Sequence, residues 1–276
     1  MIVCDDFIYI QLQKTGCSHI ASLLCQLFDC EVKGQHNAAT PEQLASAQYF
    51  ISSIRNPWDW YISLWAYGAQ GEGRLMHSLT MSTVPELSKL NFKLPLDMQG
   101  DKDKFQAQFD IYIKSVQAWR DVYGAGNSVD GFRSWLKLIH DPKNYQYLGE
   151  GYSETAITKQ CGFMSYRYLR LCCRNLEKLE GTGLELSVSE VVQFDKANCY
   201  IDYFIRQEAL EEQLCEALER VRSLTKEERG LILSGGKSNI SNRQFSIADY
   251  YDRESIDLVQ DRDRLIIEKF NYSPPS

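Results

Sequence analysis

Hydrophobic and polar residues follow each other along this chain in blocks that predict short buried strands, each succeeded by a helix. The run Phe7–Leu12, rich in β-branched and aromatic residues, predicts a buried strand. Apolar residues then recur at the spacing of an amphipathic helix: Ile20, Leu23, Leu24, Leu27 and Phe28. Tyr49–Ile54 predicts a second strand, and Pro57 opens a second helix. Two strand–loop–helix units this close together indicate parallel βαβ construction.

Helical patterns dominate the rest of the chain. We expect helices at Phe105–Tyr123, Val129–His140, Phe163–Leu179, Glu208–Leu224, Thr225–Leu233 and Arg253–Phe270, and a further strand at Cys199–Arg206. Residues 68–103 contain several glycines and prolines and predict a long irregular segment of the kind that often serves function. No repeat or linker divides the chain, so we expect one domain over residues 1–276. The expected fold class is a three-layer α/β domain, P-loop-like, with a mainly parallel central sheet flanked by helices.

Composition and charge narrow the functions that this chain can have. The formal net charge of −7 argues against a broad nucleic-acid surface, so a polyanionic ligand would need a local pocket of Lys and Arg. Nine cysteines form no C-x-x-C pair, which argues against zinc and favours reduced thiols in a cytoplasmic protein. No apolar stretch approaches the roughly 18 residues of a membrane span.

The first loop, Gln13-Lys-Thr-Gly-Cys-Ser18, has the composition of a phosphate-binding turn. Backbone N–H groups at the start of a helix point outward, and the helix dipole is positive there. Lys14 adds a positive charge, Thr15 and Ser18 offer hydroxyl donors, and Gly16 allows close backbone approach. The alternative is an ordinary strand-to-helix loop that happens to contain a lysine.

The second loop begins at Arg55, where the second strand ends. Ser63 falls about two turns into the helix that follows if this helix starts near Pro57. An arginine and a hydroxyl that converge near a strand end can hold a second phosphate through charge-assisted hydrogen bonds. The alternative is a surface ion pair.

Neither loop is a Walker loop, which needs G-x-x-x-x-G-K-[ST] with the lysine after the glycines. Lys14 precedes Gly16, and in the later stretch Gly235-Gly-Lys-Ser238 the first required glycine would fall at Leu231. An ATPase or GTPase is therefore disfavoured.

Together these residues carry a family resemblance. Gln13-Lys-Thr-Gly-Cys-Ser18 resembles the 5′-phosphosulfate loop of sulfotransferases that use 3′-phosphoadenosine 5′-phosphosulfate (PAPS), commonly P-K-T-G-[TS]-[TS]. Arg55-Asn-Pro-Trp-Asp-Trp-Tyr-Ile-Ser63 resembles their 3′-phosphate motif, R-[ND]-P-x-[DE]-R-x-x-S. The segments Tyr203–Glu212 and Lys237–Tyr251, with Tyr272, resemble later parts of the family pattern, whereas residues 70–190 are unmatched. Gln13, Cys17 and Trp60 depart from it, and Cys17 removes one hydroxyl donor.

The resemblance implies transfer of a sulfuryl group from PAPS to a hydroxyl or amine of a small-molecule or carbohydrate acceptor, with no metal. It assigns donor binding to both motifs and to a nucleotide-covering loop: Lys14, Thr15, Gly16, Cys17, Ser18, Arg55, Ser63, Lys237, Asn239 and Arg243. Lys14 would stabilise the leaving oxygen.

The candidate general base is His36, between the two motifs, because a neutral imidazole accepts protons near pH 7. The alternative is a solvent-exposed loop histidine, in which case Glu31 and Glu72 are the reserve candidates. Three other functions stay open: a catalytically silent protein that binds nucleotide or a partner on the same fold, a P-loop phosphoryl-transfer enzyme, and a plain α/β interaction domain in which the paired motifs are a coincidence.

Overall fold

A computed structural model describes residues 1–46, 48–81, 116–126, 128–181, 183, 185–234 and 245–276. A five-stranded sheet in the order β3-β1-β2-β4-β5 forms its centre. The strands are β1 (Ile2–Cys4), β2 (Phe7–Ile10), β3 (Cys30–Val32), β4 (Tyr49–Ile54) and β5 (Tyr203–Arg206). The protein is therefore an α/β protein with an open sheet, and the two strands expected at the start of both units are present.

The sheet is mixed, which corrects the expectation of a mainly parallel one. β2, β4 and β5 are parallel neighbours, but β1 is antiparallel to both β2 and β3. Only Asp5 and Asp6 separate β1 from β2, and so short a connection can join only antiparallel strands.

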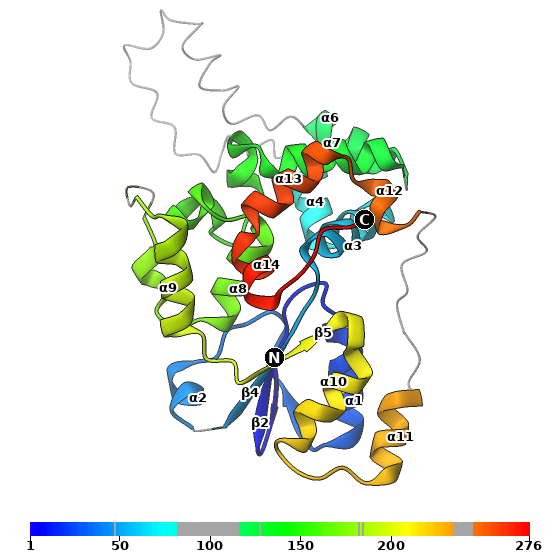
Figure 1. Ribbon diagram of the computed structural model, residues 1–276, viewed down its shortest axis with the longest axis vertical. Helices are drawn as coiled ribbons and strands as arrows, with labels where there is room; N and C mark the ends of the chain where they lie inside the picture. Colours follow the sequence, from blue (N-terminus) through cyan, green and yellow to red (C-terminus); the bar gives the residue numbers. More distant parts are fainter. Residues whose placement is uncertain (47, 82–115, 127, 182, 184, 235–244) are drawn as a thin grey trace, which may run out of the picture.

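Helices pack on both faces of the sheet and beyond its carboxyl edge (Figure 1). They are α1 (Cys17–Leu27), α2 (Pro41–Ala45), α3 (Pro57–Ala69), α4 (Arg74–Thr80), α6 (Val116–Gly124), α7 (Val129–His140), α8 (Phe163–Cys172), α9 (Val188–Asn198), α10 (Leu210–Glu219), α11 (Lys226–Ser234), α12 (Ile247–Tyr250), α13 (Arg253–Arg262) and α14 (Arg264–Phe270). Short 3₁₀ turns occupy Pro142–Tyr147, Tyr152–Glu154, Ala156–Lys159, Leu176–Leu179 and Gln207–Ala209.

Alternating strand residues divide between two hydrophobic cores, as the period of a strand requires. Phe7 and Tyr9 of β2 face the core shared with α1 and α10, whereas Ile8 and Ile10 face the larger core built with α3, α7 and α8. The loops that follow β2 and β4 therefore begin at strands that pack against a hydrophobic core on each face.

Several element boundaries differ from the sequence expectations. The helix expected over Phe163–Leu179 ends at Cys172, because Cys173 is extended and pairs with Cys199 in an isolated antiparallel bridge. The strand expected from Cys199 begins only at Tyr203, because Cys199 pairs with Cys173 in this isolated bridge and not with a strand of the sheet. The helix expected from Phe105 is described only from Val116, and α9 was not expected at all.

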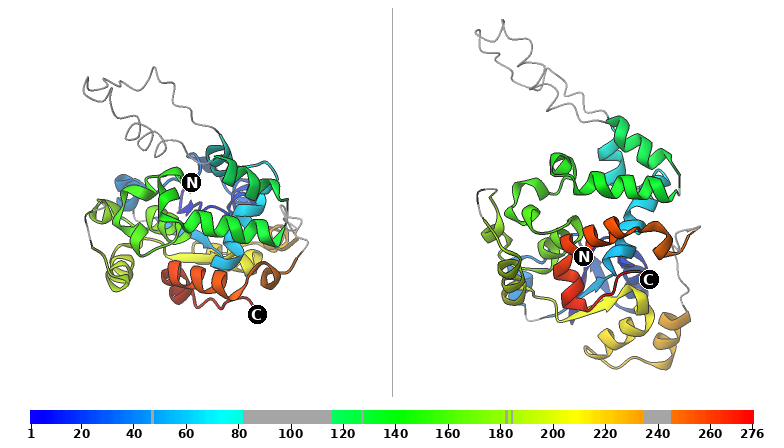
Figure 2. Two further views of the ribbon diagram at one scale, coloured as in Figure 1. Left: turned by 90° about the horizontal axis from the view of Figure 1, so that it is seen from above. Right: turned by 45° about the horizontal axis from the view of Figure 1, so that its top comes forward.

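The helix expected over Arg253–Phe270 is split at Asp263, which is fully buried. Its carboxylate accepts hydrogen bonds from Tyr61 Oη at 2.7 Å and from the backbone N–H and hydroxyl of Ser165, each at 2.8 Å. Gly162 must be glycine, since a Cβ there would lie 2.5 Å from Asp263 Oδ2. These bonds fasten the C-terminal helices to α3 and α8, and Figure 2 shows the C-terminal segment beside β5 in both views.

The expectation that all cysteines are reduced is wrong for one pair: Cys4 and Cys30 form a disulfide between β1 and β3. The other seven cysteines are free thiols, and five of these are buried. Among the described residues, no helix is both long and apolar enough to cross a bilayer.

Candidate functional site

The two motif loops lie side by side at the carboxyl edge of the sheet. β2 and β4 are parallel neighbours, with Ile10 opposite Ser52, so the loops that leave them meet. A direct hydrogen bond joins them: Arg55 Nη1 donates to the backbone oxygen of Lys14 at 3.0 Å. The structure thus brings together the two segments that the sequence singled out.

The first loop is held in an unusual backbone conformation. Lys14 and Gly16 both have positive φ, at 62° and 82°. Gly16 is the N-cap of α1, and a Cβ on it would lie 2.4 Å from Leu210 Cδ1 on α10. The close approach of α10 and the left-handed backbone both require glycine at this position.

The Thr15 hydroxyl points inward, in contrast to its expected contact with phosphate. Thr15 is fully buried; its hydroxyl donates to Leu12 O at 2.7 Å and lies 2.6 Å from Ser53 Oγ. Since Thr15 has one proton to donate, Ser53 donates to Thr15, and Tyr9 Oη donates to Ser53 at 2.7 Å. This chain of hydroxyls ties the first loop to β2 and β4, and Thr15 can offer a ligand only its backbone.

Two other side chains of this loop take opposite directions. Cys17 is 7% exposed and packs into the core between the sheet and α1, and burial raises the pKa of its thiol. Ser18 is exposed in the first turn of α1. The first turn of α1 contains no acidic residue, and its N-cap glycine supplies no capping side chain. The N–H groups and the Ser18 hydroxyl are therefore suited to an anion.

The Lys14 side chain leaves the loop toward α3. Its ammonium lies 3.9 Å from the ring centroid of Tyr67, a cation–π contact. Tyr67 is itself exposed, so Lys14 lies at the surface of this edge rather than in the core.

Gln13, which replaces the family's usual proline, brings a polar group into the loop. Its backbone oxygen accepts the indole N–H of Trp60 at 2.7 Å. Its side chain is only 9% exposed, and in the described part of the chain Gln13 Oε1 has no hydrogen-bond partner. A buried acceptor without a donor is costly, and a bound ligand can supply one.

In the second loop, the arginine side chain makes its hydrogen bonds within the protein. Arg55 Nε and Nη2 both donate to Asp59 Oδ2, at 2.7 and 2.6 Å, and both side chains are about nine-tenths buried. Asn56 caps α3 by accepting from the Trp58 N–H, and its own N–H donates to Glu208 Oε1 at 2.6 Å. Ser63 lies inside α3 and is 7% exposed. The predicted roles of Arg55 and Ser63 toward a phosphate stay predictions.

His36 is attached to the short segment between β2 and the first loop rather than exposed on its own. Its Nδ1 lies 2.8 Å from the backbone oxygen of Gln11, and its φ is 58°. A carbonyl oxygen can only accept, so Nδ1 carries the proton and Nε2 keeps the lone pair. Burial lowers the pKa of His36 below its ordinary value, which favours the neutral form that a base needs.

Two charged residues that the sequence did not suggest lie near His36. Arg167 of α8 lowers the pKa of His36, and Glu150 raises it. Arg167 donates to Glu150 Oε1 at 2.7 Å and lies over the Phe163 ring at 4.1 Å. Its side chain is 6% exposed, and none of the described residues accepts from its Nη1. Arg167, which is paired with Glu150, is therefore a buried charge within electrostatic range of the candidate base.

The reserve bases are less suited to catalysis than His36. Glu31 is largely exposed and pairs with Lys33 at 3.0 Å, and Glu72 is exposed. Lys237, Asn239 and Arg243 lie outside the described residues.

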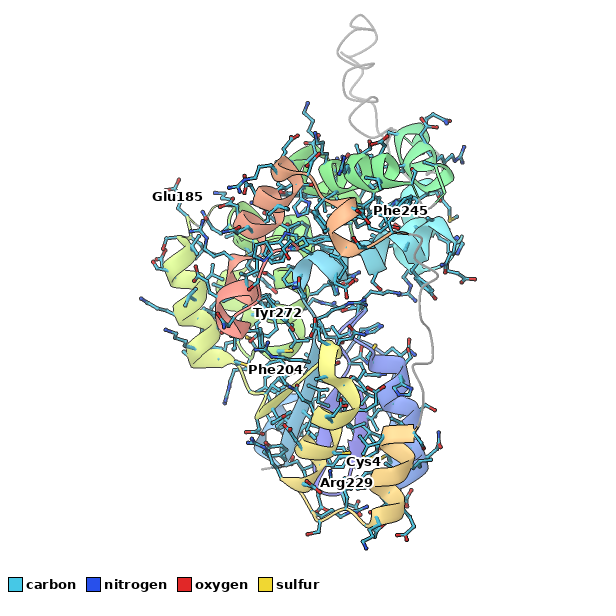
Figure 3. The ribbon with its side chains drawn as sticks, turned by 45° about the vertical axis from the view of Figure 1, so that its right-hand side comes forward. Cys4, Glu185, Phe204, Arg229, Phe245 and Tyr272 are labelled. Atoms are coloured by element: carbon cyan, nitrogen blue, oxygen red, sulfur yellow. A yellow bond between two sulfur atoms is a disulfide. The ribbon has the colours of Figure 1, made fainter. Side chains whose placement is uncertain are left out.

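The C-terminal segment reaches the second loop through Glu208, whose Oε2 accepts from Tyr272 Oη at 3.3 Å. Arg206 at the end of β5 lies over the Tyr272 ring at 5.1 Å. Figure 3 shows Tyr272 close to Phe204 of β5, where the helices meet the sheet, and far from Cys4. The resemblance to the family at Tyr203–Glu212 and at Tyr272 thus falls on segments that contact each other.

Comparisons of this chain with protein-family models, with characterised proteins and with solved structures find no match.

Proposed function

We propose that this protein transfers a sulfuryl group from PAPS to a hydroxyl or amine of a small-molecule or carbohydrate acceptor. One observation carries the proposal: the two motif loops follow adjacent parallel strands and are joined by the bond from Arg55 Nη1 to Lys14 O. A ligand with two phosphate groups needs two anion sites at a fixed separation. The bond between Arg55 and Lys14 keeps the two loops at a fixed distance from each other. The mixed sheet does not alter this, since β2, β4 and β5 are parallel.

On the donor side, the N-terminal turn of α1 would bind the 5′-phosphosulfate through backbone N–H groups and the Ser18 hydroxyl. The Lys14 ammonium would leave Tyr67 to meet the charge that grows on the bridging oxygen as the sulfur–oxygen bond breaks. The second loop would bind the 3′-phosphate near Arg55. The orphaned Gln13 Oε1 would accept a hydrogen bond from the bound donor or acceptor.

On the acceptor side, His36 would take the proton as the acceptor oxygen or nitrogen attacks sulfur. Its Nδ1–H is fixed on Gln11 O, so the lone pair on Nε2 has a defined orientation relative to the loop that holds Lys14. The nearby Arg167 favours the neutral form of His36 before the reaction, and Glu150 compensates the charge after it.

A thermal-shift comparison tests the donor site. 3′-Phosphoadenosine 5′-phosphate at a hundredfold excess over its dissociation constant should stabilise the fold by about 2.7 kcal/mol. In a protein of this size, that raises the midpoint by roughly 2–4 °C per kcal/mol. AMP should do much less, since it leaves the site of the 3′-phosphate empty. Equal shifts from the two nucleotides would remove the basis for assigning the second motif.

A transfer assay separates the proposal from its rivals. PAPS labelled in the sulfuryl group should pass label to a hydroxyl- or amine-bearing acceptor from a panel of saccharides and small alcohols. A shift with 3′-phosphoadenosine 5′-phosphate but no label transfer, and no slow hydrolysis of PAPS, would indicate a silent nucleotide-binding protein. A larger shift with ATP than with the bisphosphate would instead indicate a phosphoryl-transfer enzyme.

A further inference from the structure

Two cysteines far apart in the sequence face each other across an isolated antiparallel bridge: Cys173 after α8 and Cys199 after α9. The flanking bonds run from Arg174 N to Asn198 O and from Tyr200 N to Cys172 O, each 3.0 Å. This pattern makes Cys173 and Cys199 a non-hydrogen-bonded pair, in which the Cα atoms lie about 4.5 Å apart. That separation falls within the range that disulfides span, about 4.4–6.8 Å.

The same chain contains a bridged pair of the same kind. Cys4 and Cys30 are opposite each other in β1 and β3, two positions from the Ile2–Val32 pair that the bond from Lys33 N to Met1 O flanks. They too form a non-hydrogen-bonded pair, with Cα atoms 4.4 Å apart. In both pairs the cysteines are 26 residues apart along the chain. The backbone geometry that accommodates one disulfide is therefore repeated at Cys173 and Cys199.

The surroundings of the second pair favour a thiolate. The Tyr168 hydroxyl donates to Asp195 Oδ1 at 2.6 Å and lies 3.4 Å from Cys199 Sγ, and Cys173 Sγ lies 3.7 Å from the same carboxylate oxygen. A hydrogen bond from the Cys173 thiol lowers the pKa of Cys199 to about 6; burial opposes this, and Tyr168 and Lys269 support it. The pKa of Cys173 is raised, first by that same hydrogen bond and then by burial. Cys199 is half-buried whereas Cys173 is buried, so of the two thiols Cys199 is the more accessible to an oxidant.

We propose that Cys173 and Cys199 form an oxidative modification site that closes to a disulfide when the protein meets a hydroperoxide. The Cys199 thiolate attacks one peroxide oxygen, the O–O bond breaks, and a sulfenic acid forms on Cys199 while water or an alcohol leaves. Cys173 then attacks that sulfur, the S–O bond breaks, water leaves and the S–S bond forms. Two thiols lose two electrons, which reduce the peroxide. A dithiol reductant reverses the step by exchange.

A metal is the other ligand that two cysteines and a carboxylate could take. The candidate ligand atoms of Cys173, Asp195 and Cys199 lie within 4.8 Å of one another. However, the Lys269 ammonium already binds both oxygens of Asp195, at 2.8 and 3.0 Å, and donates to Tyr168 Oη at 2.6 Å. This ammonium occupies the cation position of the cluster, which favours the disulfide over a metal ion.

Peptide mapping of the whole protein tests the proposal. Protein that keeps the Cys4–Cys30 disulfide and has Cys173 and Cys199 as free thiols is treated with hydrogen peroxide. Remaining thiols are alkylated, and disulfide-linked tryptic peptides are identified. We expect a new linkage between the peptides 171–174 and 197–206, reversed by dithiothreitol. The first peptide contains both Cys172 and Cys173, so Cys172→Ser should retain the linkage and Cys173→Ser should abolish it. Cys172 is the matched control, because it is fully buried and burial raises its pKa.

A second measurement tests the proposal on the wild-type protein, so it does not depend on whether the cysteine variants fold. Oxidised wild-type protein should melt several degrees above the reduced form that keeps Cys4–Cys30, since closing a loop of this length restricts the unfolded chain. Cys25→Ser, which removes an exposed thiol, should leave that difference unchanged. The proposal is overturned if peroxide leaves Cys199 as a sulfinic acid with no linkage, if the linkage uses Cys172, or if the purified protein carries a stoichiometric metal that Cys199→Ser loses.

Discussion

The two strand–loop–helix units at the carboxyl edge of the sheet resemble each other in sequence pattern but differ in where their polar groups point. In the unit from β2 to α1, Ser18 is exposed in the first turn of the helix, and the backbone oxygen of Gln11, between β2 and the first loop, holds His36. In the unit from β4 to α3, Arg55 is directed inward, onto Asp59 and onto the backbone of the first loop.

A motif match alone assigns the same role, phosphate binding, to both loops. The different directions of their polar groups favour different roles. In the proposed function, the first loop presents groups to the donor, and Arg55 of the second loop, besides lying near the 3′-phosphate, supports the first loop because its guanidinium fixes the Lys14 carbonyl. Changes at the side chains that the first unit exposes should therefore alter rate or affinity with little loss of stability, whereas a change at Arg55 should cost stability as well as weaken binding of the 3′-phosphate. The following variants test this division.

The largest expected effect on the reaction rate comes from His36, which the backbone oxygen of Gln11 positions just before the first loop. His36→Ala should reduce the rate by roughly 10²–10⁴, measured as sulfuryl transfer or PAPS hydrolysis, with unchanged nucleotide affinity. The wild-type rate should fall toward acid pH as the imidazole takes a proton. Because burial lowers the pKa of His36, the midpoint of this acid limb should lie below 6.5, and the variant should lack it. His77→Ala, in an exposed position of α4, is the control. Wild-type turnover in His36→Ala would return attention to Glu31 and Glu72.

Lys14→Ala should lower kcat by about 10²–10³, the usual cost of losing one donor to developing negative charge. Thermal stability should change little, because the ammonium lies at the surface, over the ring of the exposed Tyr67. Lys137→Ala removes a lysine from an exposed ion pair with Glu254 and should leave the rate unaltered. A Lys14→Ala protein with wild-type kcat would exclude a role for this lysine in the chemical step.

Arg55→Ala should cost stability in addition to weakening nucleotide binding. It leaves the Asp59 carboxylate buried without its partner and releases the Lys14 carbonyl, at a cost of about 3 kcal/mol in unfolding free energy. The matched control is Arg253→Ala, which breaks an exposed Arg–Asp pair with the same i,i+4 spacing. That pair should contribute no more than about 0.5 kcal/mol. Denaturant unfolding of both variants provides the comparison, and equal losses would contradict the supporting role of the second loop.

Local patterns predicted the parts of the fold that local forces determine. Strands β2 and β4, the helices after them and the two loops followed from runs of apolar residues and from Pro57 and Gly16. The unexpected α9 also had a local signal, since Ser187 and Glu190 form a capping box at its start. The antiparallel β1 escaped notice because its three residues have no pattern before their partner is known.

Contacts between distant segments could not be read from the sequence. The inward hydroxyl of Thr15 depends on Ser53 of another strand, and the pKa of His36 depends first on its burial by distant segments and then on groups such as Arg167 of α8. A motif specifies residue types, but it does not say whether a hydroxyl faces the ligand or the core. The Cys4–Cys30 disulfide likewise depends on the pairing of β1 with β3, which only the folded sheet reveals.

The smallest expected effect separates two hydroxyls of the first loop. Thr15→Val keeps the shape of the side chain but interrupts the chain from Tyr9 through Ser53 to Leu12 O, so stability should fall by about 1 kcal/mol. Affinity for 3′-phosphoadenosine 5′-phosphate should not change, because this hydroxyl has no proton to offer a phosphate. Ser18→Ala should do the opposite: unchanged stability and an affinity several-fold weaker, as expected for one hydrogen bond to a charged group. Calorimetric titration and denaturant unfolding of both variants measure the pair. Weaker binding in Thr15→Val with intact binding in Ser18→Ala would mean that the loop rearranges around its ligand and turns Thr15 outward.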